Sequence, residues 1–254
     1  MDFTNLFNLE GKVALVTGGS QGLGSYIVQG FLQYGVRVGV FDIKKPEHES
    51  WINDFEKDYS FIQCDVSDPI QVSKAVQKIV KHFKRIDILV NCAGIVGQAM
   101  AENMSNEIWD RIIKVNLYGT FYVCREVGKI MIMQKSGKIV NMASQAGVIG
   151  LPRGNSNYCT SKGGVIALTK TLAVEWAKYN IRVNSVSPCH FNTPFTEKLM
   201  KDPNTANGIL ARIPLGRIGE ANDIVGPVIF LASNASSMIT GHNLMVDGGV
   251  TSSY

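Results

Sequence analysis

Short apolar runs alternate along the chain with longer segments whose apolar residues recur at helical spacing. The runs predict strands at 12–17, 36–41, 60–64, 86–90, 138–142, 181–187 and 242–246. The longer segments predict helices at 25–34, 69–84, 106–133, 158–178 and 221–232. Such alternation is typical of an α/β domain.

Segment 189–217 interrupts this alternation, because it is irregular and rich in proline and glycine. It follows the end of a strand, where open α/β sheets bind ligands. We therefore expect it to be a mobile lid over a substrate. The chain has no internal repeat, linker or low-complexity tract, so residues 1–254 are expected to form one domain.

A glycine-rich turn, TGGSQGLG, separates the first strand from the first helix. Strand, glycine turn and helix in this order are the context that dinucleotide binding requires. Gly18, Gly22 and Gly24 would let the backbone approach a pyrophosphate, and the helix N-terminus offers free N–H groups. The alternative is a tight turn between two packed elements.

Asp42 ends the second strand, about 20 residues beyond the glycine turn. A carboxylate there can accept both hydroxyls of the adenosine ribose and would repel a 2′-phosphate. Gln21 offers no positive charge to attract one. NAD is therefore predicted rather than NADP, although Lys44 and Lys45 lie close enough to weaken this preference. Alternatively, Asp42 only caps the next segment.

Ser144, Tyr158 and Lys162 lie in a stretch that ends a strand, crosses a loop and begins a helix. Tyr158 and Lys162 are four residues apart, which places them on one helix face. A phenol titrates near pH 10, and a cation about 4 Å away supplies the roughly 4 kcal/mol that brings its pKa to about 7. The resulting phenolate could take a proton from an alcohol, and Ser144 would hydrogen-bond the same alcohol oxygen. Alternatively, the pair is an ordinary surface contact.

Asn116 and the stretch Asn91–Gly94 are two further candidates for the active site. Asn116 lies among apolar residues of the helix at 106–133, so it is either a satisfied core amide or an active-site group that holds a water. The small residues of Asn91–Gly94 follow the fourth strand and permit the close approach of a planar ring or ribose. The alternative for them is a plain strand-to-loop turn.

Composition and charge exclude several classes of protein. Hydrophobic residues make up 45% and charged residues 18%, and the net charge of +4 has no clustered basic run, so no nucleic-acid partner is expected. The five cysteines contain no C-x-x-C pair, which argues against disulfides and metal and favours a reduced, cytoplasmic location. No apolar run approaches the roughly 18 residues of a membrane span, and the start is no secretory signal.

The motifs together resemble the short-chain dehydrogenase/reductase family over nearly the whole chain. Their joint order and spacing carries the resemblance: Thr17-Gly18-x-x-x-Gly22-x-Gly24, Asp65, Asn91-x-Ala93-Gly94, Asn116, Ser144 and Tyr158-x-x-x-Lys162. The resemblance implies a doubly wound Rossmann fold, a seven-stranded parallel sheet with helices on both faces. It also implies a homotetramer with the helices at 106–133 and 158–178 at one interface, and the latter helix is apolar on more than one face.

The resemblance also implies roles for single residues. Tyr158 would exchange the proton with the substrate oxygen, Ser144 would stabilise that oxygen, and Lys162 would lower the Tyr158 pKa and bind the nicotinamide ribose. Asn116 would hold a water in a proton relay. Cofactor contacts would come from Gly18, Ser20, Gln21, Gly22, Leu23, Gly24, Asp42, Ile43, Asp65, Val66, Asn91, Ala93, Gly94, Tyr158, Lys162, Pro188 and Thr193. Substrate contacts would come from Ser144, Gln145, Tyr158 and His190.

One departure concerns Pro188-Cys189-His190, because the family usually has Pro-Gly there. A side chain would replace hydrogen beside the nicotinamide and reshape the substrate pocket. His190 either contacts substrate or is a half-exposed loop histidine.

The two ends of the chain, LFNLEGKVALVTG and RIPLGRIGEANDIVGPVIFLAS, are similar to sugar-acid and polyol dehydrogenases of the gluconate 5-dehydrogenase type. We therefore expect an NAD-dependent enzyme acting on a secondary alcohol of a sugar acid, polyol or sugar. An NADPH-dependent 3-oxoacyl-[acyl-carrier-protein] reductase is the first alternative, although these usually have Arg at the position of Gln21. A non-catalytic NAD-binding protein is the second. An enoyl reductase is disfavoured, because the resemblance there would call for a wider Tyr-to-Lys spacing.

Overall fold

The computed structural model describes residues 5–46, 50–152, 154–193, 196 and 201–253. Its centre is one seven-stranded sheet with the strand order β3-β2-β1-β4-β5-β6-β7, and every neighbouring pair is parallel. The strands are β1 (Val13–Thr17), β2 (Arg37–Asp42), β3 (Tyr59–Gln63), β4 (Ile88–Asn91), β5 (Gly137–Met142), β6 (Ile181–Pro188) and β7 (Asn243–Val246). The predicted seven-stranded parallel sheet is confirmed.

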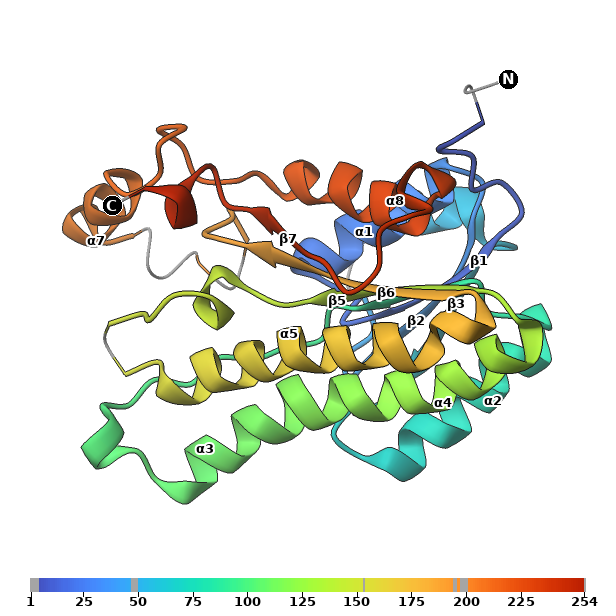
Figure 1. The fold of residues 1–254 in the computed structure, drawn as a ribbon, viewed down its shortest axis with the longest axis horizontal. Coiled ribbons are helices and arrows are strands. Elements are labelled where there is room, and N and C mark those ends of the chain that lie inside the picture. The colour runs from blue at the N-terminus through green and yellow to red at the C-terminus, as the bar shows by residue number, and fades with distance from the viewer. Residues whose placement is uncertain (1–4, 47–49, 153, 194–195, 197–200, 254) are drawn as a thin grey trace.

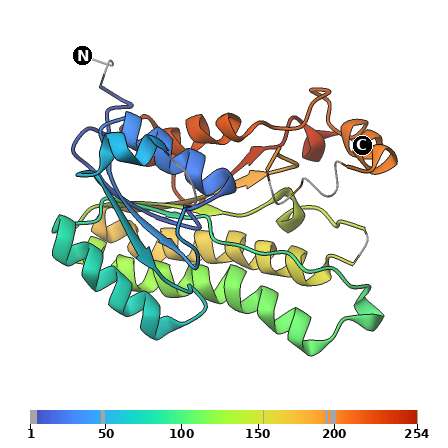
Figure 2. The same ribbon diagram turned by 180° about the vertical axis from the view of Figure 1, so that it is seen from behind.

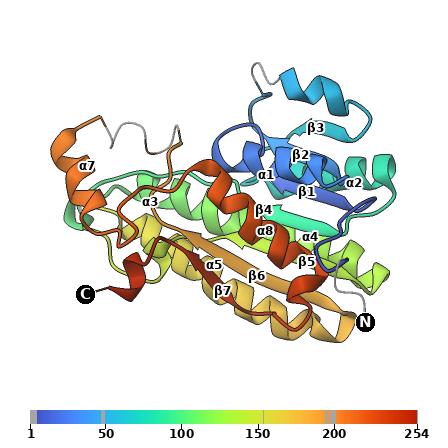
Figure 3. The same cartoon turned by 90° about the horizontal axis from the view of Figure 1, so that it is seen from above.

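Helices cover both faces of this sheet (Figure 1). The α-helices are α1 (Gly22–Gln33), α2 (Pro69–Phe83), α3 (Asn106–Ile113), α4 (Gly119–Gln134), α5 (Ser156–Trp176), α7 (Pro203–Leu210) and α8 (Val225–Ala232). Helices α1 and α8 lie on one face, as the view from above shows (Figure 3), and α2, α4 and α5 lie on the other (Figure 2). The doubly wound α/β fold is therefore confirmed.

The strands are apolar on both sides because each face packs on helices. On the α1 and α8 face, Phe31 and Val228 pack in one cluster with Val16, Val90 and Val140. On the opposite face, a second cluster joins alternate strand residues to the apolar stripes of α2, α4 and α5. Period-two side-chain alternation thus gives the central strands two buried faces, while the edge strands β3 and β7 are only partly buried. No helix among the described residues is long and apolar enough to cross a membrane.

Two predicted elements differ from the structure. The single helix expected at 106–133 is divided by a π-helical segment, Lys114–Tyr118, that separates α3 from α4. Such π segments often lie at functional sites. The segment 189–217, expected to be irregular, contains helix α7. That helix begins at Pro203 because the Asp202 carboxylate accepts from two backbone N–H groups of the first turn.

Candidate active site

The glycine turn lies at the C-terminal end of β1, packed against the loop that follows β4. A Cβ on Gly18 would lie 2.7 Å from the Ala93 Cα, and one on Gly24 would overlap the Gly18 carbonyl oxygen. Close packing therefore explains why these two positions are glycine, as the tight-turn alternative predicts. Gly22 differs, since it has a φ of 54° and nothing within 4 Å of a Cβ. Its backbone faces open space, which leaves room for a ligand to approach.

The first turn of α1 is open to an anion. The N-cap residue Gln21 makes no side-chain cap hydrogen bond, and the first turn carries no acidic residue. The Ser20 hydroxyl is 8% exposed and has no hydrogen-bond partner among the described residues. A buried hydroxyl without a partner beside free N–H groups fits a phosphate oxygen. The residues present therefore fit a dinucleotide cofactor here.

Asp42 ends β2 beside this turn. Its Oδ2 accepts from the Ser20 N–H at 3.1 Å and its Oδ1 from the Lys44 N–H at 3.2 Å. The carboxylate is buried, and each oxygen has a further lone pair for a ribose hydroxyl. The capping and ribose-binding readings of Asp42 are therefore compatible. Ile43, the next residue, is exposed.

Asp65 and Val66, the predicted adenine contacts, follow β3. The Asp65 Oδ1 accepts from the N–H and hydroxyl of Ser67 at 2.9 Å and 2.7 Å, which forms a local turn. The Val66 side chain is buried against the start of α4, where a Cβ on Gly119 would lie 2.8 Å from it. Val66 is therefore part of the core, and little of its side chain is open to a ligand.

Asn91 does not face the crevice with its side chain. Its Nδ2 donates to the Asn141 Oδ1 at 2.9 Å and to the Cys124 Sγ at 3.1 Å, inside the core. The Asn91 Oδ1 has no hydrogen-bond partner among the described residues, and the predicted cofactor contact of Asn91 stays a prediction. The loop beyond it is held by Thr17, whose hydroxyl accepts from the N–H groups of Cys92 and Ala93. In the sequence, the only signal that Thr17 holds this loop was its position directly before Gly18.

Asn116 lies in the π-helical segment and is fully buried. Its Oδ1 accepts from the Ile95 N–H at 2.9 Å, and its Nδ2 donates to the Ile95 carbonyl at 3.0 Å and the Ser161 hydroxyl at 3.1 Å. The side chain is therefore the satisfied core amide of the two alternatives. The Oδ1 accepts one hydrogen bond and has a second lone pair, so the water-holding role stays a prediction.

The structure brings Ser144, Tyr158 and Lys162 together. Ser144 follows β5, and its hydroxyl shares a hydrogen bond with Tyr158 in the first turn of α5. One turn further, Lys162 is 4% exposed, and its Nζ donates to the Met142 carbonyl at 2.7 Å. That Nζ lies 5.8 Å from the centroid of the Tyr158 ring. A Cβ on Gly94 would lie 3.5 Å from the same Nζ, so the loop after β4 closes this site.

Burial dominates the titration of both groups. Desolvation raises the pKa of Tyr158 to about 12, and only the Ser144 hydrogen bond acts to lower it. Desolvation also lowers the pKa of Lys162 to about 8. The Lys162 ammonium is not among the causes of the Tyr158 pKa shift in the protein alone, and its predicted lowering of that pKa stays a prediction. The ammonium bonds to a β5 carbonyl and lies over the ring, while burial disfavours both charged forms.

The predicted substrate-side residues are less well defined. The Gln145 side chain is 4% exposed, and its Oε1 has no hydrogen-bond partner among the described residues. His190 is half-buried, and its pKa is lowered by burial and then by the charge of Arg212. Thr193 bonds within its own loop, to Thr196. The rest of the predicted lid lies partly outside the described residues.

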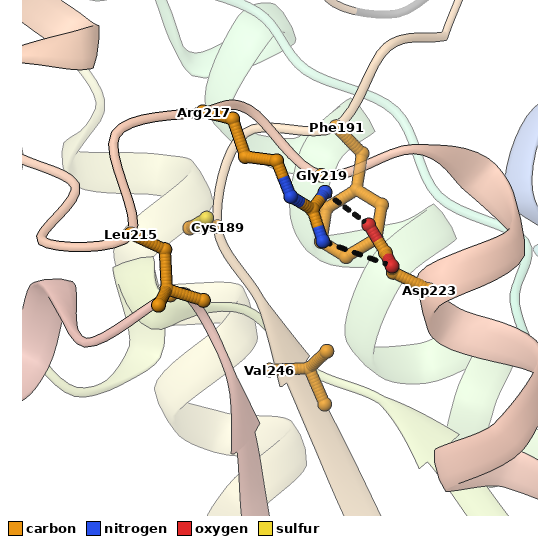
Figure 4. A pocket seen from close by; sticks show the side chains of 8 residues that line it. Cys189, Phe191, Leu215, Arg217, Gly219, Asp223 and Val246 are labelled. Atoms are coloured by element: carbon orange, nitrogen blue, oxygen red, sulfur yellow. Dashed lines mark hydrogen bonds and ion pairs between the residues drawn. The ribbon is translucent and has the colours of Figure 1, made fainter.

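A separate cavity of about 220 Å³ lies at the ends of β6 and β7 (Figure 4). Phe191, Leu215 and Val246 form apolar walls, and Arg217 pairs with Asp223 at 2.6 Å. Cys189 lines this cavity, so its side chain lies in apolar surroundings. Sequence reasoning did not find this cavity, because its walls come from three segments that are far apart in the chain: the residues after β6, the segment 215–223 and the end of β7.

Comparisons with known proteins identify the family. The model of the family described as Enoyl-(Acyl carrier protein) reductase matches residues 18–251. The chain is 44% identical to a 3-oxoacyl-[acyl-carrier-protein] reductase of Thermotoga maritima, over 95% of this chain and 98% of that protein. It is 39% identical to the D-threitol dehydrogenase of Mycolicibacterium smegmatis, over 96% and 95%. The structure of a gluconate 5-dehydrogenase from Burkholderia cenocepacia in complex with NADP and tartrate has a TM-score of 0.92 and 33% identity, covering 98% of this chain and 99% of that one.

The chain belongs to the short-chain dehydrogenase/reductase family, and it is an oxidoreductase of that family.

Proposed function

We propose that the protein is an NAD(H)-dependent oxidoreductase that interconverts a secondary alcohol and a ketone on a sugar acid, polyol or sugar. The proposal is supported by one observation: the side chains of Ser144, Tyr158 and Lys162 lie close together beside the loop after β4. A non-catalytic NAD-binding protein on the same fold has no need for a buried lysine beside a buried tyrosine. Burying that ammonium is costly.

The cofactor would occupy the crevice at the C-terminal ends of the central strands. The glycine turn and the first turn of α1 would hold its pyrophosphate, and Asp42 its adenosine ribose. When bound, the nicotinamide ring supplies the acceptor or donor of a hydride. The Lys162 Nζ lies 5.8 Å from the centroid of the Tyr158 ring, and there it would hold the nicotinamide ribose.

Tyr158 would move the proton at its hydroxyl oxygen. With a pKa of about 12 in the protein alone, Tyr158 is protonated near neutral pH and can give its proton to a forming alkoxide during ketone reduction. Alcohol oxidation is the reverse, so Tyr158 must first lose its own proton, and the phenolate oxygen then accepts the proton of the alcohol. The Ser144 hydrogen bond, which lowers the Tyr158 pKa, favours that direction. Ser144 would also hold the substrate oxygen in place.

The substrate class rests on the relatives and on the site. One relative is a D-threitol dehydrogenase and a structural neighbour is a gluconate 5-dehydrogenase, so polyol and sugar-acid dehydrogenases are both among the similar proteins. The Gln145 amide lies next to Ser144 and would bond a second hydroxyl of such a substrate. His190 would contact the substrate from the segment 189–217, which would close over it as a lid.

Two further proposals concern assembly and location. Exposed apolar side chains occur on α4 and α5, at Phe121, Met133 and Val174, and on the π-helical segment at Tyr118. We infer that these helices pack against other copies in a homotetramer, which light scattering in solution would measure. The five free cysteines favour the reducing cytoplasm.

The second candidate function is an NADPH-dependent 3-oxoacyl-[acyl-carrier-protein] reductase. It is favoured by the 44% identity to such a reductase, and a structural neighbour binds NADP. Enoyl reduction is not proposed, because Tyr158 and Lys162 lie one helical turn apart.

The cofactor preference is tested by Asp42→Asn, which keeps the shape of the side chain and removes its charge. We expect the variant to bind NADPH at least tenfold more tightly than the wild type, a change of about 1.4 kcal/mol, because the repulsion of a 2′-phosphate is lost. NADH binding should weaken severalfold. Fluorescence titration of both cofactors measures this. Asp54→Asn removes an exposed carboxylate elsewhere and should change neither affinity; tighter NADPH binding by the wild type would overturn the preference.

The function itself is tested by following NAD reduction over a panel of polyols, sugars and sugar acids, with 3-oxoacyl thioesters and NADPH as the competing assay. Turnover of a panel alcohol at a rate above that of the thioester supports the proposal. A preference for the thioester favours the second candidate, and no turnover of either favours a non-catalytic protein.

A further inference from the structure

A line of buried polar side chains crosses the core from β4 to α5. The Asn91 Nδ2 donates to the Asn141 Oδ1 at 2.9 Å, and the Asn141 Nδ2 donates to the Thr169 hydroxyl at 2.9 Å. The Thr169 hydroxyl in turn donates to the Val165 carbonyl of its own helix at 2.8 Å. All three side chains are at most 3% exposed. We call Asn91, Asn141 and Thr169 the amide ladder.

The amide ladder also reaches α4. The Cys124 Sγ lies 3.1 Å from the Asn91 Nδ2 and donates to the Asn141 Oδ1 at 3.6 Å. Burial raises the pKa of Cys124 to about 12, so the thiol keeps its proton. Asn91 and Asn141 are partners in the parallel register of β4 and β5, which places both amides on the same face of the sheet. The ladder therefore joins two central strands to two helices.

The position of the ladder relates it to the reaction centre. Thr169 lies seven residues after Lys162, two turns along the same face of α5. Asn141 directly precedes Met142, whose carbonyl accepts from the Lys162 Nζ at 2.7 Å. Two consecutive residues of β5 thus contact α5 at two points along the helix. Met142 contacts Lys162 at the reaction centre, and Asn141 contacts Thr169 deeper in the core.

Apolar packing alone would fix α5 less well. The helix carries apolar residues on more than one side, since Val165 and Leu172 are buried while Val174 is exposed. Apolar contact is non-directional, so it tolerates small shifts and rotations of a helix. Hydrogen bonds with defined geometry do not. The ladder therefore adds a directional contact to α5, two turns beyond the hydrogen bonds of Ser161 and Lys162.

We propose that Asn141 and Thr169 are positioning residues: the amide ladder sets the register of α5 on β5 and thereby holds Lys162 at the Met142 carbonyl and Tyr158 at Ser144. This inference rests on the proposed function for its effect on turnover. Its structural part, the register of α5, stands independently of that function. The alternative is that the ladder only satisfies buried polar groups.

Thr169→Val is the test, because it is nearly isosteric and removes the hydroxyl that Asn141 and Val165 use. We expect kcat to fall by about thirtyfold or more and the pH profile of kcat to shift by half a unit or more. Thr169→Ser keeps the hydroxyl and should stay within about twofold of the wild type. Thr171→Val is the matched control on the exposed side of α5, where the hydroxyl bonds only its own helix.

Hydrogen exchange gives a readout that does not depend on activity. In Thr169→Val, amides of 156–166 should exchange at least tenfold faster than in Thr169→Ser; exchange that accelerates only around residue 169 would overturn the proposal. Unchanged kcat and pH profile with a lowered melting temperature would also overturn it. If Thr169→Val does not fold, Thr169→Ala is measured in the same way. A wild type that oxidises no panel alcohol defeats the proposed function, while the exchange comparison still decides the register of α5.

Discussion

Tyr158→Phe is expected to lower kcat for alcohol oxidation by about 10³-fold or more, the upper range of what a positioned proton-transfer group contributes. The phenol oxygen shares a hydrogen bond with Ser144, and the Lys162 Nζ lies 5.8 Å from the centroid of the Tyr158 ring. Phenylalanine keeps the ring, so the packing of the first turn of α5 is preserved. NADH affinity should therefore change by less than about threefold. Stopped-flow kinetics and fluorescence titration measure the two effects separately.

Tyr179→Phe is the matched control for this variant. Tyr179 also has a lysine over its ring, since the Lys178 Nζ lies 5.1 Å from the ring centroid, but it follows the other end of α5. Loss of the Tyr179 hydroxyl should leave kcat unchanged. Near-normal turnover by Tyr158→Phe would refute Tyr158 as the proton-transfer group. Equal losses in both variants would mean that ring hydroxyls act on stability and not on the reaction.

The fold could be predicted from the sequence because its signals are local. Strands appear as short continuous apolar runs, and helices as apolar residues at helical spacing. The two patterns differ enough to tell strands from helices. The strand boundaries were found to within a residue or two. Helix α7 was missed, although Asp202 followed by Pro203 is a helix start signal, because its residues give no strong apolar period. The π-helical segment at Asn116 has no comparable sequence signature.

The site was predicted in part. Ser144, Tyr158 and Lys162 meet as expected, because an i,i+4 pair on a helix that follows the Ser144 strand has few other arrangements. Asn91 was predicted as a cofactor contact, and Asn116 was left open between a core amide and an active-site group; the side-chain amides of both lie in the core. A polar residue at a strand end faces one side of the sheet or the other, and only the register with neighbouring strands decides which. That register places Asn91 opposite Asn141.

The Tyr158 pKa shows a second limit of sequence reasoning. Spacing predicts which charges are neighbours, and from it alone the ammonium should make the phenol more acidic. Burial acts in the opposite direction on both groups and is the larger effect in the protein alone. Burial depends on how the loop after β4 packs on α5, at Gly94, which no local pattern encodes.

Lys162→Met is expected to abolish turnover and to change how stability depends on pH. The lysine has a pKa of about 8 in the folded protein and 10.5 in the unfolded chain. Between these values the unfolded state binds more protons, so the free energy of unfolding rises with pH. The destabilisation by the buried ammonium is fully present below pH 8 and is relieved as the pH rises toward 10.5. From pH 7 to pH 9.5 the relief is about 2 kcal/mol.

The measurement is the difference in the free energy of unfolding between wild type and Lys162→Met, from urea titrations at several pH values. A difference is needed because the buried thiols of Cys64 and Cys124 act in the opposite sense. Their raised pKa values withdraw stability above about pH 9 in both proteins. Lys170→Met, an exposed lysine on the same helix, should show no such trend. A pH-independent difference for Lys162→Met would mean that the ammonium is not desolvated, and the account of Lys162 as a buried ammonium would fail.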